Sequence, residues 1–297
     1  MSPIRHTLKS WLLRGIMLAA AAAASAASAK ATPADAEAFL AAAQRAYATA
    51  DFAGYTNSLV TAYRPAKEDM ADSPAPGGCI RWCRVEGMRN VRDIGGWNGL
   101  PTGRVYRGSA PTCRDTPANR KMGLGVTPEG VRTMREVLKI RTDLDLRGPR
   151  GIPTPGTSAL GVRLVAVALV AYTNAFVSTK GYAEALRVFA DPASYPVYVH
   201  CLGGADRTGT LMFLLEGLCG VSEADLSIDY ELTTFAAVFG RRTRALNRHY
   251  AFPQFVARLK EYPGDTLAAK IASCMETTFG LTKDEIAAIR RNILGGS

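Results

Sequence analysis

The amino-acid sequence predicts an α/β fold, in which a mostly parallel central sheet is flanked by helices. Residues 162–170 and 197–199 are short and apolar, which is typical of strands buried between two layers of helices. A helical segment at 180–189 separates the two strands, and an apolar helical segment at 208–218 follows the second strand. Strands that alternate with helices in this way indicate a parallel sheet covered by helices.

Local signals place the other elements of this fold within residues 85–297. A helix is expected after Thr127, because Thr127 can cap it and Pro128 suits its first position. The apolar face of this helix comprises Val131, Met134, Val137 and Leu138. Further strands are expected at 105–107 and 140–146, and further helices at 222–233, 252–260 and 282–292. In the last helix, Thr282 and Glu285 have the spacing of a capping box.

The first 29 residues have the features of a secretory signal peptide. Arg5, Lys9 and Arg14 form a basic start, residues 15–24 are apolar, and Ala27–Ala29 supplies the small residues that signal peptidase recognises. The apolar run is too short to span a bilayer. We therefore expect a signal peptide at 1–29 and a periplasmic or secreted protein with no transmembrane segment after signal removal. The alternative is an N-terminal membrane anchor.

The segment between the signal and the α/β fold has a different composition. An Ala-rich stretch at 35–50 carries an amphipathic pattern, with Phe39, Leu40, Ala43 and Tyr47 on one face. Residues 63–78 contain three Pro and two Gly, which is typical of a linker or loop. The sequence thus predicts a helical extension and linker at 30–84, followed by one large domain at 85–297.

The chain is basic, with 36 Lys and Arg against 26 Asp and Glu and a formal net charge of +10. Three of the basic residues lie in the signal, so the mature chain carries +10 − 3 = +7. A basic surface suits a polyanionic partner. Because no arginine-rich run interleaved with aromatic residues and no nucleic-acid motif is present, we do not expect nucleic acid as the partner.

Six cysteines are distributed over the mature chain. In an oxidising compartment disulfides persist, and a working thiolate at Cys201 would leave an odd number of other thiols. Cys79, Cys83 and Cys113 lie in Gly- and Pro-rich stretches and are candidate disulfide partners, whereas Cys219 and Cys274 lie in apolar helical patterns and are candidate buried thiols. The pairing does not follow from the sequence. The cysteine spacing does not match a zinc site and no His cluster accompanies it, so we expect no metal or other cofactor.

The segment 200–209, His-Cys-Leu-Gly-Gly-Ala-Asp-Arg-Thr-Gly, lies between a predicted buried strand and a predicted helix. Gly203 and Gly204 allow the backbone to approach an anion, and the helix N-terminus directs its N–H groups into the loop. Arg207 adds a planar fork that can hold two phosphate oxygens. The residues expected to bind phosphate are Leu202, Gly203, Gly204, Ala205, Asp206 and Arg207.

The same surroundings should activate Cys201. Oriented N–H groups and a guanidinium stabilise the thiolate, so we expect its pKa to fall below the ordinary value of about 8.5. Such a thiolate can attack phosphorus and form a phosphocysteine that water hydrolyses, with Thr208 donating a hydrogen bond to the departing sulfur. We expect His200 to shape the loop by bonding backbone. The alternative, a structural thiol beside a Gly turn, is disfavoured by Arg207 six positions after Cys201.

The C-x5-R-T pattern resembles the signature of the protein tyrosine phosphatase superfamily. The longer H-C-x-x-G-x-D-R-T-G resembles an atypical bacterial tyrosine-phosphatase family within it. Four further segments resemble motifs of that family: 90–96 (N-x-R-D-x-G-G), 106–109 (Y-R-S/G), 143–147 (D-L-R) and 229–233 (D-Y-x-L-T). The resemblance covers residues 85–294. It implies the cysteine-phosphatase α/β sandwich, with a phosphate loop between a strand and a helix, and metal-independent hydrolysis of protein phosphotyrosine through a phosphocysteine.

The sequence also departs from the relatives that this resemblance suggests. Members that act on lipid phosphates carry lysines in a C-K-x-G-K pattern, and here those places hold Leu202 and Ala205. The superfamily's usual acid is an Asp on a loop preceding the Cys, but residues 161–182 contain no carboxylate. Asp206 is the best substitute as general acid, with a structural role in the loop as its alternative. Asp93 and Asp191 are weaker candidates.

Other basic residues have supporting roles in this interpretation. We expect Arg92 and Asp93 to bond one another and brace the loop, and Arg147 either to do the same or to hold a substrate group. A cluster at Arg241, Arg242 and Arg244 either grips a second anionic group or forms a solvated surface. Two alternative functions remain: a phosphatase for phosphoinositides, inositol phosphates or another small phosphoester, and an inactive module that binds phosphate without turnover.

Overall fold

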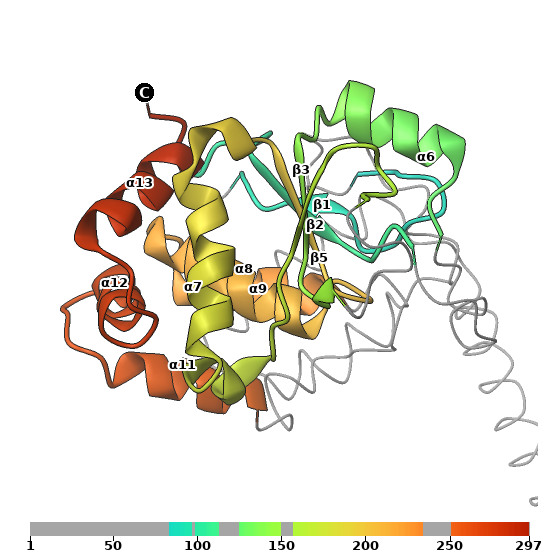
Figure 1. Cartoon of the computed structure of the whole chain (residues 1–297). Coiled ribbons are helices and arrows are strands. Elements are labelled where there is room, and N and C mark those ends of the chain that lie inside the picture. The colour runs from blue at the N-terminus through green and yellow to red at the C-terminus, as the bar shows by residue number, and fades with distance from the viewer. Residues whose placement is uncertain (1–82, 97–98, 113–124, 150–156, 234–250, 297) are drawn as a thin grey trace, which may run out of the picture.

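A five-stranded sheet lies at the centre of the computed structural model, which describes residues 83–96, 99–112, 125–149, 157–233 and 251–296 (Figure 1). The predicted signal peptide and nearly all of the predicted extension lie outside these residues. The strand order is β1-β2-β5-β3-β4, where β1 is Arg92–Asp93, β2 Val105–Gly108, β5 Val197–His200, β3 Thr142–Asp145 and β4 Arg163–Ala166. Only β1 is antiparallel to its neighbour, so the predicted mostly parallel sheet is confirmed.

The register brings the carboxyl ends of the four parallel strands to one edge of the sheet. Gly108 pairs with His200, His200 pairs with Asp145, and Asp145 pairs with Ala166. Segments that follow these strands therefore meet at this carboxyl edge, as the loops of parallel sheets do. The residues that precede the strands meet at the opposite, amino edge.

Helices cover both faces of the sheet, and most of them lie on one face (Figure 1). That face carries η5 (Tyr172–Phe176), α7 (Thr179–Ala190), α8 (Asp206–Leu218), α9 (Glu223–Leu232), α11 (Ala251–Lys260), α12 (Leu267–Thr277) and α13 (Lys283–Ile293), and a short turn, η6 (Pro192–Ser194), follows α7. α6 (Pro128–Arg132) and the π-helical turn η3 (Thr133–Val137) cover the other face. Within the described residues no helix is long and apolar enough to cross a membrane.

Alternating side chains of the buried strands supply two separate apolar cores. Val197 and Val199 of β5 face the larger core, which they share with α7, α8 and the C-terminal helices. Tyr198, between them, faces the smaller core together with Tyr106 of β2 and Met134 of η3. This period of two is the geometry of an extended strand, and burial of both faces explains why 197–199 is apolar throughout.

Most predicted elements are present, with shifted ends. Thr127 caps α6 by accepting a hydrogen bond from Gly130 N at 3.1 Å, and Thr282 with Glu285 forms the predicted capping box. Beyond Arg132 the helix widens, because Leu138 N donates to Thr133 O at 3.0 Å. This turn exposes Val137, which was predicted to lie on the apolar face and is 61% exposed. The short β1 was not predicted, and α12 was indicated only by the helical pattern around Cys274, without bounds.

Candidate active site

The loop that joins β5 to α8 lies at the carboxyl edge of the sheet. β5 ends at His200, Cys201 follows immediately, and α8 begins at Asp206. Ala205, the residue before α8, provides no side-chain cap, so the first N–H groups of the helix are directed toward the loop. The strand and the helix predicted on either side of the loop are therefore confirmed.

Close packing against β2 requires glycine within the loop. Gly204 has a φ of +66°, in the left-handed region, and a Cβ built there would lie 2.2 Å from the carbonyl oxygen of Gly108. Gly108 has no room for a side chain either, since its Cβ would lie 2.4 Å from Tyr198 Oη. Ala110 N also donates to Leu202 O at 2.8 Å. The loop is thus held against the end of β2 by contacts that larger residues would prevent.

Cys201 is buried, at 4% exposure, yet its thiol is made more acidic by its neighbours. Burial alone would raise the pKa of Cys201, because it disfavours the charged thiolate. The Arg207 guanidinium, the hydroxyl and N–H of Thr208, and the N–H of Gly204 outweigh that effect and lower the pKa. The pKa of Cys201 therefore lies below its ordinary value, which favours the nucleophilic form of the sulfur.

A buried polar network braces the loop from beneath. Asn90 Nδ2 donates to the carbonyls of Gly203 and Gly204 at 3.0 and 3.1 Å, and Arg107 Nη2 donates to Gly204 O at 2.8 Å. Asp229, on α9, accepts from Arg107 Nη1 at 2.5 Å and from Arg92 Nε at 3.0 Å. We call Asn90, Arg92, Arg107 and Asp229 the brace; each is at most 1% exposed. Removing one member would leave a buried charge or donor without its partner, at a cost of about 3–5 kcal/mol.

His200 links the loop to the neighbouring strand β3. Its Nδ1 lies 3.0 Å from the carbonyl oxygen of Cys201, and its Nε2 lies 2.9 Å from Asp143 Oδ1. Ser158 Oγ donates to the other oxygen of Asp143 at 2.6 Å. Burial opposes protonation of His200, but the Asp143 carboxylate outweighs it and raises the pKa of the imidazole. His200 thus lies against the loop backbone through Nδ1 and against the Asp143 carboxylate through Nε2.

The Arg147 guanidinium makes a bidentate contact with the Asp145 carboxylate. Its Nε lies 2.9 Å from Asp145 Oδ1 and its Nη2 2.7 Å from Asp145 Oδ2, while Nη1 donates to Thr112 O at 2.7 Å. These contacts involve all three guanidinium nitrogens of Arg147. They tie the end of β3 to the segment that follows β2.

Asp206 is held by a tyrosine from the segment that precedes α7. Tyr172 Oη donates to Asp206 Oδ1, and the same hydroxyl lies 2.6 Å from Tyr230 Oη. Tyr172 N donates to Thr210 Oγ1 at 3.0 Å, and Thr210 Oγ1 donates to Asp206 O at 2.9 Å. Both the backbone and the side chain of Asp206 are therefore linked to η5.

A family model described as the tyrosine phosphatase family matches residues 83–295. The chain belongs to the tyrosine phosphatase family. The match covers the whole sheet, the phosphate loop and the C-terminal helices, and it supports phosphatase activity.

Solved structures give more distant matches to this chain. One is the core catalytic domain of the PP-IP phosphatase SIW14 from S. cerevisiae in complex with citrate, with 21% identity and a TM-score of 0.34 over 58% of this chain and 86% of that one. Another SIW14 catalytic-core structure has 18% identity and a TM-score of 0.32 over 60% of this chain and 93% of that one. No curated protein matches the sequence.

Several residues that support or adjoin the loop were not predicted from the sequence to do so. Asn90, Arg107 and Asp229 lay within the quoted motifs, but their partners are more than ninety residues away in sequence. Tyr172 carried one signal, which is that it lies in the carboxylate-free segment 161–182. The motifs therefore contain these residues, but their contacts with one another and with the loop follow only from the fold.

The acidic candidates outside the loop occupy other positions. Arg92 and Asp93 were predicted to bond one another, but successive strand residues point to opposite faces. Arg92 joins the brace, whereas Asp93 accepts from Gly95 N at 2.7 Å and Gly103 N at 2.5 Å and holds the turn before β2. Asp191 pairs with Arg163 at 3.1 Å, at the start of β4. It therefore lies at the amino edge, across the sheet from Cys201, which excludes it as the acid.

The remaining cysteines fall into two groups. Cys274 is buried and Cys219 half-buried, both with free thiols, which agrees with their assignment to apolar helical patterns. Burial raises the pKa of Cys274 to about 11 and that of Cys219 to about 12. Cys83 is buried, while Cys79, Cys113 and the Arg241, Arg242 and Arg244 cluster lie outside the described residues. In the described part of the chain no three His, Cys, Asp or Glu side chains are grouped as metal ligands.

Proposed function

We propose that this phosphatase hydrolyses phosphomonoesters through a phosphocysteine on Cys201 and that its substrate class is protein phosphotyrosine. The observation that carries the proposal is a buried thiol whose pKa is lowered, at the N-terminus of α8 and beside Arg207. Burial without these partners raises the pKa of a thiol, so the arrangement favours nucleophilic chemistry over structural packing.

In the first step the Cys201 thiolate attacks phosphorus in line with the bond to the leaving oxygen. The S–P bond forms as the P–O bond breaks, and the leaving oxygen takes a proton from the Asp206 carboxyl. Arg207 and the N–H groups at the start of α8 stabilise the negative charge that spreads over the three remaining oxygens in the transition state. Arg207 can do so with two donors at once.

In the second step water attacks the phosphocysteine. The Asp206 carboxylate accepts one proton from the water, the S–P bond breaks, and inorganic phosphate and the Cys201 thiolate are released. The Thr208 hydroxyl donates to the departing sulfur, a contact supported by its lowering of the pKa of Cys201. Asp206 is proposed as the acid because it stands in the first turn of α8 and belongs to the loop itself.

The side chains of the loop favour a substrate with one phosphate group. Leu202 and Ala205 stand where lysines of a C-K-x-G-K pattern would add two positive charges, and Arg207 is the one cation between Cys201 and Thr208. One arginine is sufficient to hold the single phosphate group of an aryl ester. The competing candidate is a phosphoinositide, inositol phosphate or other small phosphoester, which the net charge of the chain favours.

A turnover panel on the purified protein tests the proposal. The panel compares kcat/KM for phosphotyrosine, phosphoserine and phosphothreonine peptides, phosphoinositides and inositol hexakisphosphate. We expect the phosphotyrosine peptides to be the best substrates. A higher kcat/KM for a phosphoinositide or inositol phosphate would establish the competing candidate. Tight binding of vanadate without turnover of any substrate would establish an inactive phosphate-binding module.

We also propose that the phosphatase is exported, on the basis of the basic, apolar and small-residue pattern in residues 1–29. N-terminal sequencing of the protein recovered from cells tests this directly. Cleavage after Ala29 is the expected result, and an intact N-terminus on a membrane-bound protein would indicate an anchor instead.

A further inference from the structure

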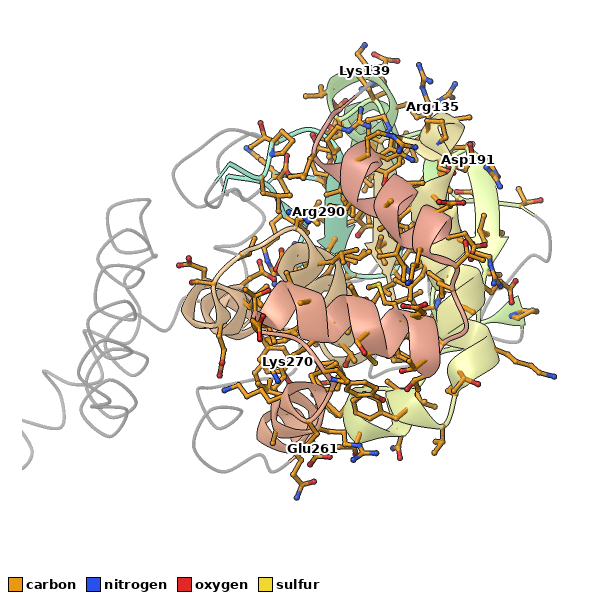
Figure 2. All side chains as sticks on the ribbon, turned by 90° about the vertical axis from the view of Figure 1, so that its left-hand side faces the viewer. Arg135, Lys139, Asp191, Glu261, Lys270 and Arg290 are labelled. Atoms are coloured by element: carbon orange, nitrogen blue, oxygen red, sulfur yellow. The ribbon has the colours of Figure 1, made fainter. Side chains whose placement is uncertain are left out.

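A basic pocket lies at the amino edge of the sheet, across the sheet from Cys201. Its cavity measures about 700 Å³, within the range of small-molecule sites. Part of its wall comes from the residues that immediately precede the four parallel strands, namely Arg104, Arg141, Val162 and Pro196. Arg135 and Lys139 complete its basic lining, and Figure 2 shows both at the same end of the molecule as Asp191.

Three of the four cations in this pocket have no partner within the described chain. Arg135, Lys139 and Arg141 are exposed, and none forms a side-chain hydrogen bond or an ion pair with another described residue. No acidic side chain lines the cavity. Like charges that converge on one concave surface repel each other, and a bound anion relieves that repulsion.

The fourth cation, Arg104, is held in place by its surroundings. Its Nε and Nη2 donate to Asn292 O at 3.0 and 2.6 Å, and its guanidinium carbon lies 4.5 Å above the ring of Tyr195. Tyr195 is itself fixed, because its hydroxyl donates to Phe189 O at 2.8 Å. Arg104 is therefore oriented before any ligand arrives, which reduces the entropy lost on binding.

We propose that this pocket binds a small anion that carries two or more phosphate groups, at a site separate from Cys201. Arg104 precedes β2 and Arg141 precedes β3, and β5 lies between these strands. Two strand spacings separate the two arginine backbones by about 10 Å, so one phosphate does not satisfy both. The four basic side chains of this pocket contribute to the net positive charge of the chain, and none of them belongs to the phosphate loop.

Calorimetric titration of the full protein with inorganic tripolyphosphate tests the site. The charge-reversed double variant Arg135→Glu/Lys139→Glu should bind tripolyphosphate at least about tenfold more weakly at this site, with aryl phosphate turnover unchanged. The control variant Arg258→Glu/Lys283→Glu makes the same charge change on the exposed surface of α11 and α13 and should bind as wild type. Equal affinity in the double variant, or equal losses in both variants, would overturn the proposal.

Two further arms identify the source of the phosphate groups. Inositol hexakisphosphate in solution and vesicles containing phosphatidylinositol bisphosphate are compared on wild type and on Arg135→Glu/Lys139→Glu. Variant-sensitive binding of the soluble compound alone assigns the pocket to a free polyphosphate. Variant-sensitive binding of the vesicles alone assigns it to lipid headgroups. If the variant alters neither, the pocket does not recognise phosphate groups.

A second inference concerns Tyr172 and rests on the proposed function. The backbone of Tyr172 has a φ of +61°, a strained conformation that bulky side chains rarely adopt. Its N–H donates a hydrogen bond to Thr210 Oγ1 and its hydroxyl donates one to Asp206 Oδ1. The same hydroxyl contacts the hydroxyl of Tyr230, whose ring stacks on Phe252 with centroids 3.8 Å apart. These contacts hold a strained residue directly against the proposed acid.

We infer that Tyr172 is a positioning residue for proton transfer by Asp206. Its hydroxyl occupies one carboxyl oxygen, so that the other oxygen carries the proton to the leaving group. When that proton has left, the same hydroxyl hydrogen bond stabilises the carboxylate. Both effects matter most for a leaving oxygen that needs its proton early, such as that of an alkyl phosphate.

Tyr172→Phe removes the hydroxyl and keeps the ring. It should lower kcat on alkyl phosphates about tenfold with little change in KM, and lower kcat on activated aryl phosphates much less. Combined with Asp206→Asn it should cause no further loss, because the two residues act as one unit. Tyr262→Phe, which removes a hydroxyl bonded to Thr278, is the matched control.

The outcomes separate this inference from the proposed function. Equal kcat of Tyr172→Phe and wild type on both substrate classes overturns the positioning role while Cys201 turnover stands. Additive losses in the double variant also overturn it, since they indicate a structural effect independent of Asp206. Absence of turnover in the wild type overturns the proposed function itself.

Discussion

Cys201 and Cys274 are both buried thiols, and their surroundings move the thiol pKa in opposite directions. Burial raises the pKa of Cys274 to about 11, even though hydroxyl groups of Tyr262 and Thr278 bond to it and Arg258 acts on it weakly. At Cys201 burial acts in the same direction, but Arg207, Thr208 and the N–H of Gly204 reverse it. Hydroxyl groups lower the thiol pKa at both sites, so they do not explain the difference.

The difference arises from a close guanidinium and from oriented backbone N–H groups. Cys274 lies inside α12, where the N–H groups are used by the helix, whereas Cys201 lies ahead of α8, where they are directed at the sulfur. The brace beneath the loop keeps these donors in place by binding the carbonyls of Gly203 and Gly204. A reactive cysteine here is thus a property of the strand–loop–helix arrangement.

The largest effect is expected from exchanging the sulfur itself. Cys201→Ser should abolish turnover, because a hydroxyl is not ionised by these donors, and it should retain vanadate binding. Cys274→Ser makes the same atomic change in the helical layer and should retain wild-type kcat/KM. Steady-state kinetics and vanadate titration on both variants check this. Substantial activity in Cys201→Ser would remove Cys201 as nucleophile.

Arg207→Lys should cost about 10³-fold in kcat/KM, since a point charge replaces a planar fork that holds two oxygens. The pKa of Cys201 should rise in the same variant, because Arg207 is the strongest of the groups that lower it. Kinetics with an aryl phosphate and the pH dependence of iodoacetamide alkylation measure the two effects. A variant within about threefold of wild type would show that Arg207 does not face the phosphate.

Asp206→Asn should slow hydrolysis of alkyl phosphates about 10²-fold and that of activated aryl phosphates much less, because a good leaving group needs little protonation. Both substrate classes are measured on one folded preparation. Equal losses on the two classes, with weaker vanadate binding and a lower Tm, would instead assign Asp206 a structural role in the loop.

The sheet and the loop could be predicted because their signals are local. Residues 197–199 are apolar on both faces, and Cys201, Arg207 and Thr208 lie close together in the sequence, in the loop and the first turn of α8. The predicted strand 162–170 is longer than β4, Arg163–Ala166, because its partner β3 ends at Asp145 and the chain turns at Gly148. A strand at the edge of a sheet can extend only as far as its neighbour, and that limit lies in another segment.

The brace and the Tyr172 contact could not be predicted because they join distant segments. Asn90 and Gly203 are 113 positions apart, and Tyr172 and Asp206 are 34 apart. The sequence around Asp229 does not indicate that its carboxylate accepts hydrogen bonds from Arg92 of β1 and Arg107 of β2. The start of α12, which was given no bounds from the sequence, did carry a local signal, since Thr266 caps the helix by accepting from Ala269 N.

The smallest effect is expected from Thr208→Ala, which leaves Arg207 and the loop amides in place. The Thr208 hydroxyl lowers the pKa of Cys201, so its removal should raise that pKa. At pH 6 alkylation by iodoacetamide should therefore slow, and the two rates should converge as the pH is raised until both proteins hold a thiolate. Hydrolysis of the phosphocysteine should slow about tenfold, because the departing sulfur loses its donor.

Cys274, with a pKa of about 11, should remain unreacted at pH 6 in both proteins and serves as the internal reference. Identical pH profiles of alkylation would mean that Arg207 and the backbone N–H groups account for the whole difference between the two thiols.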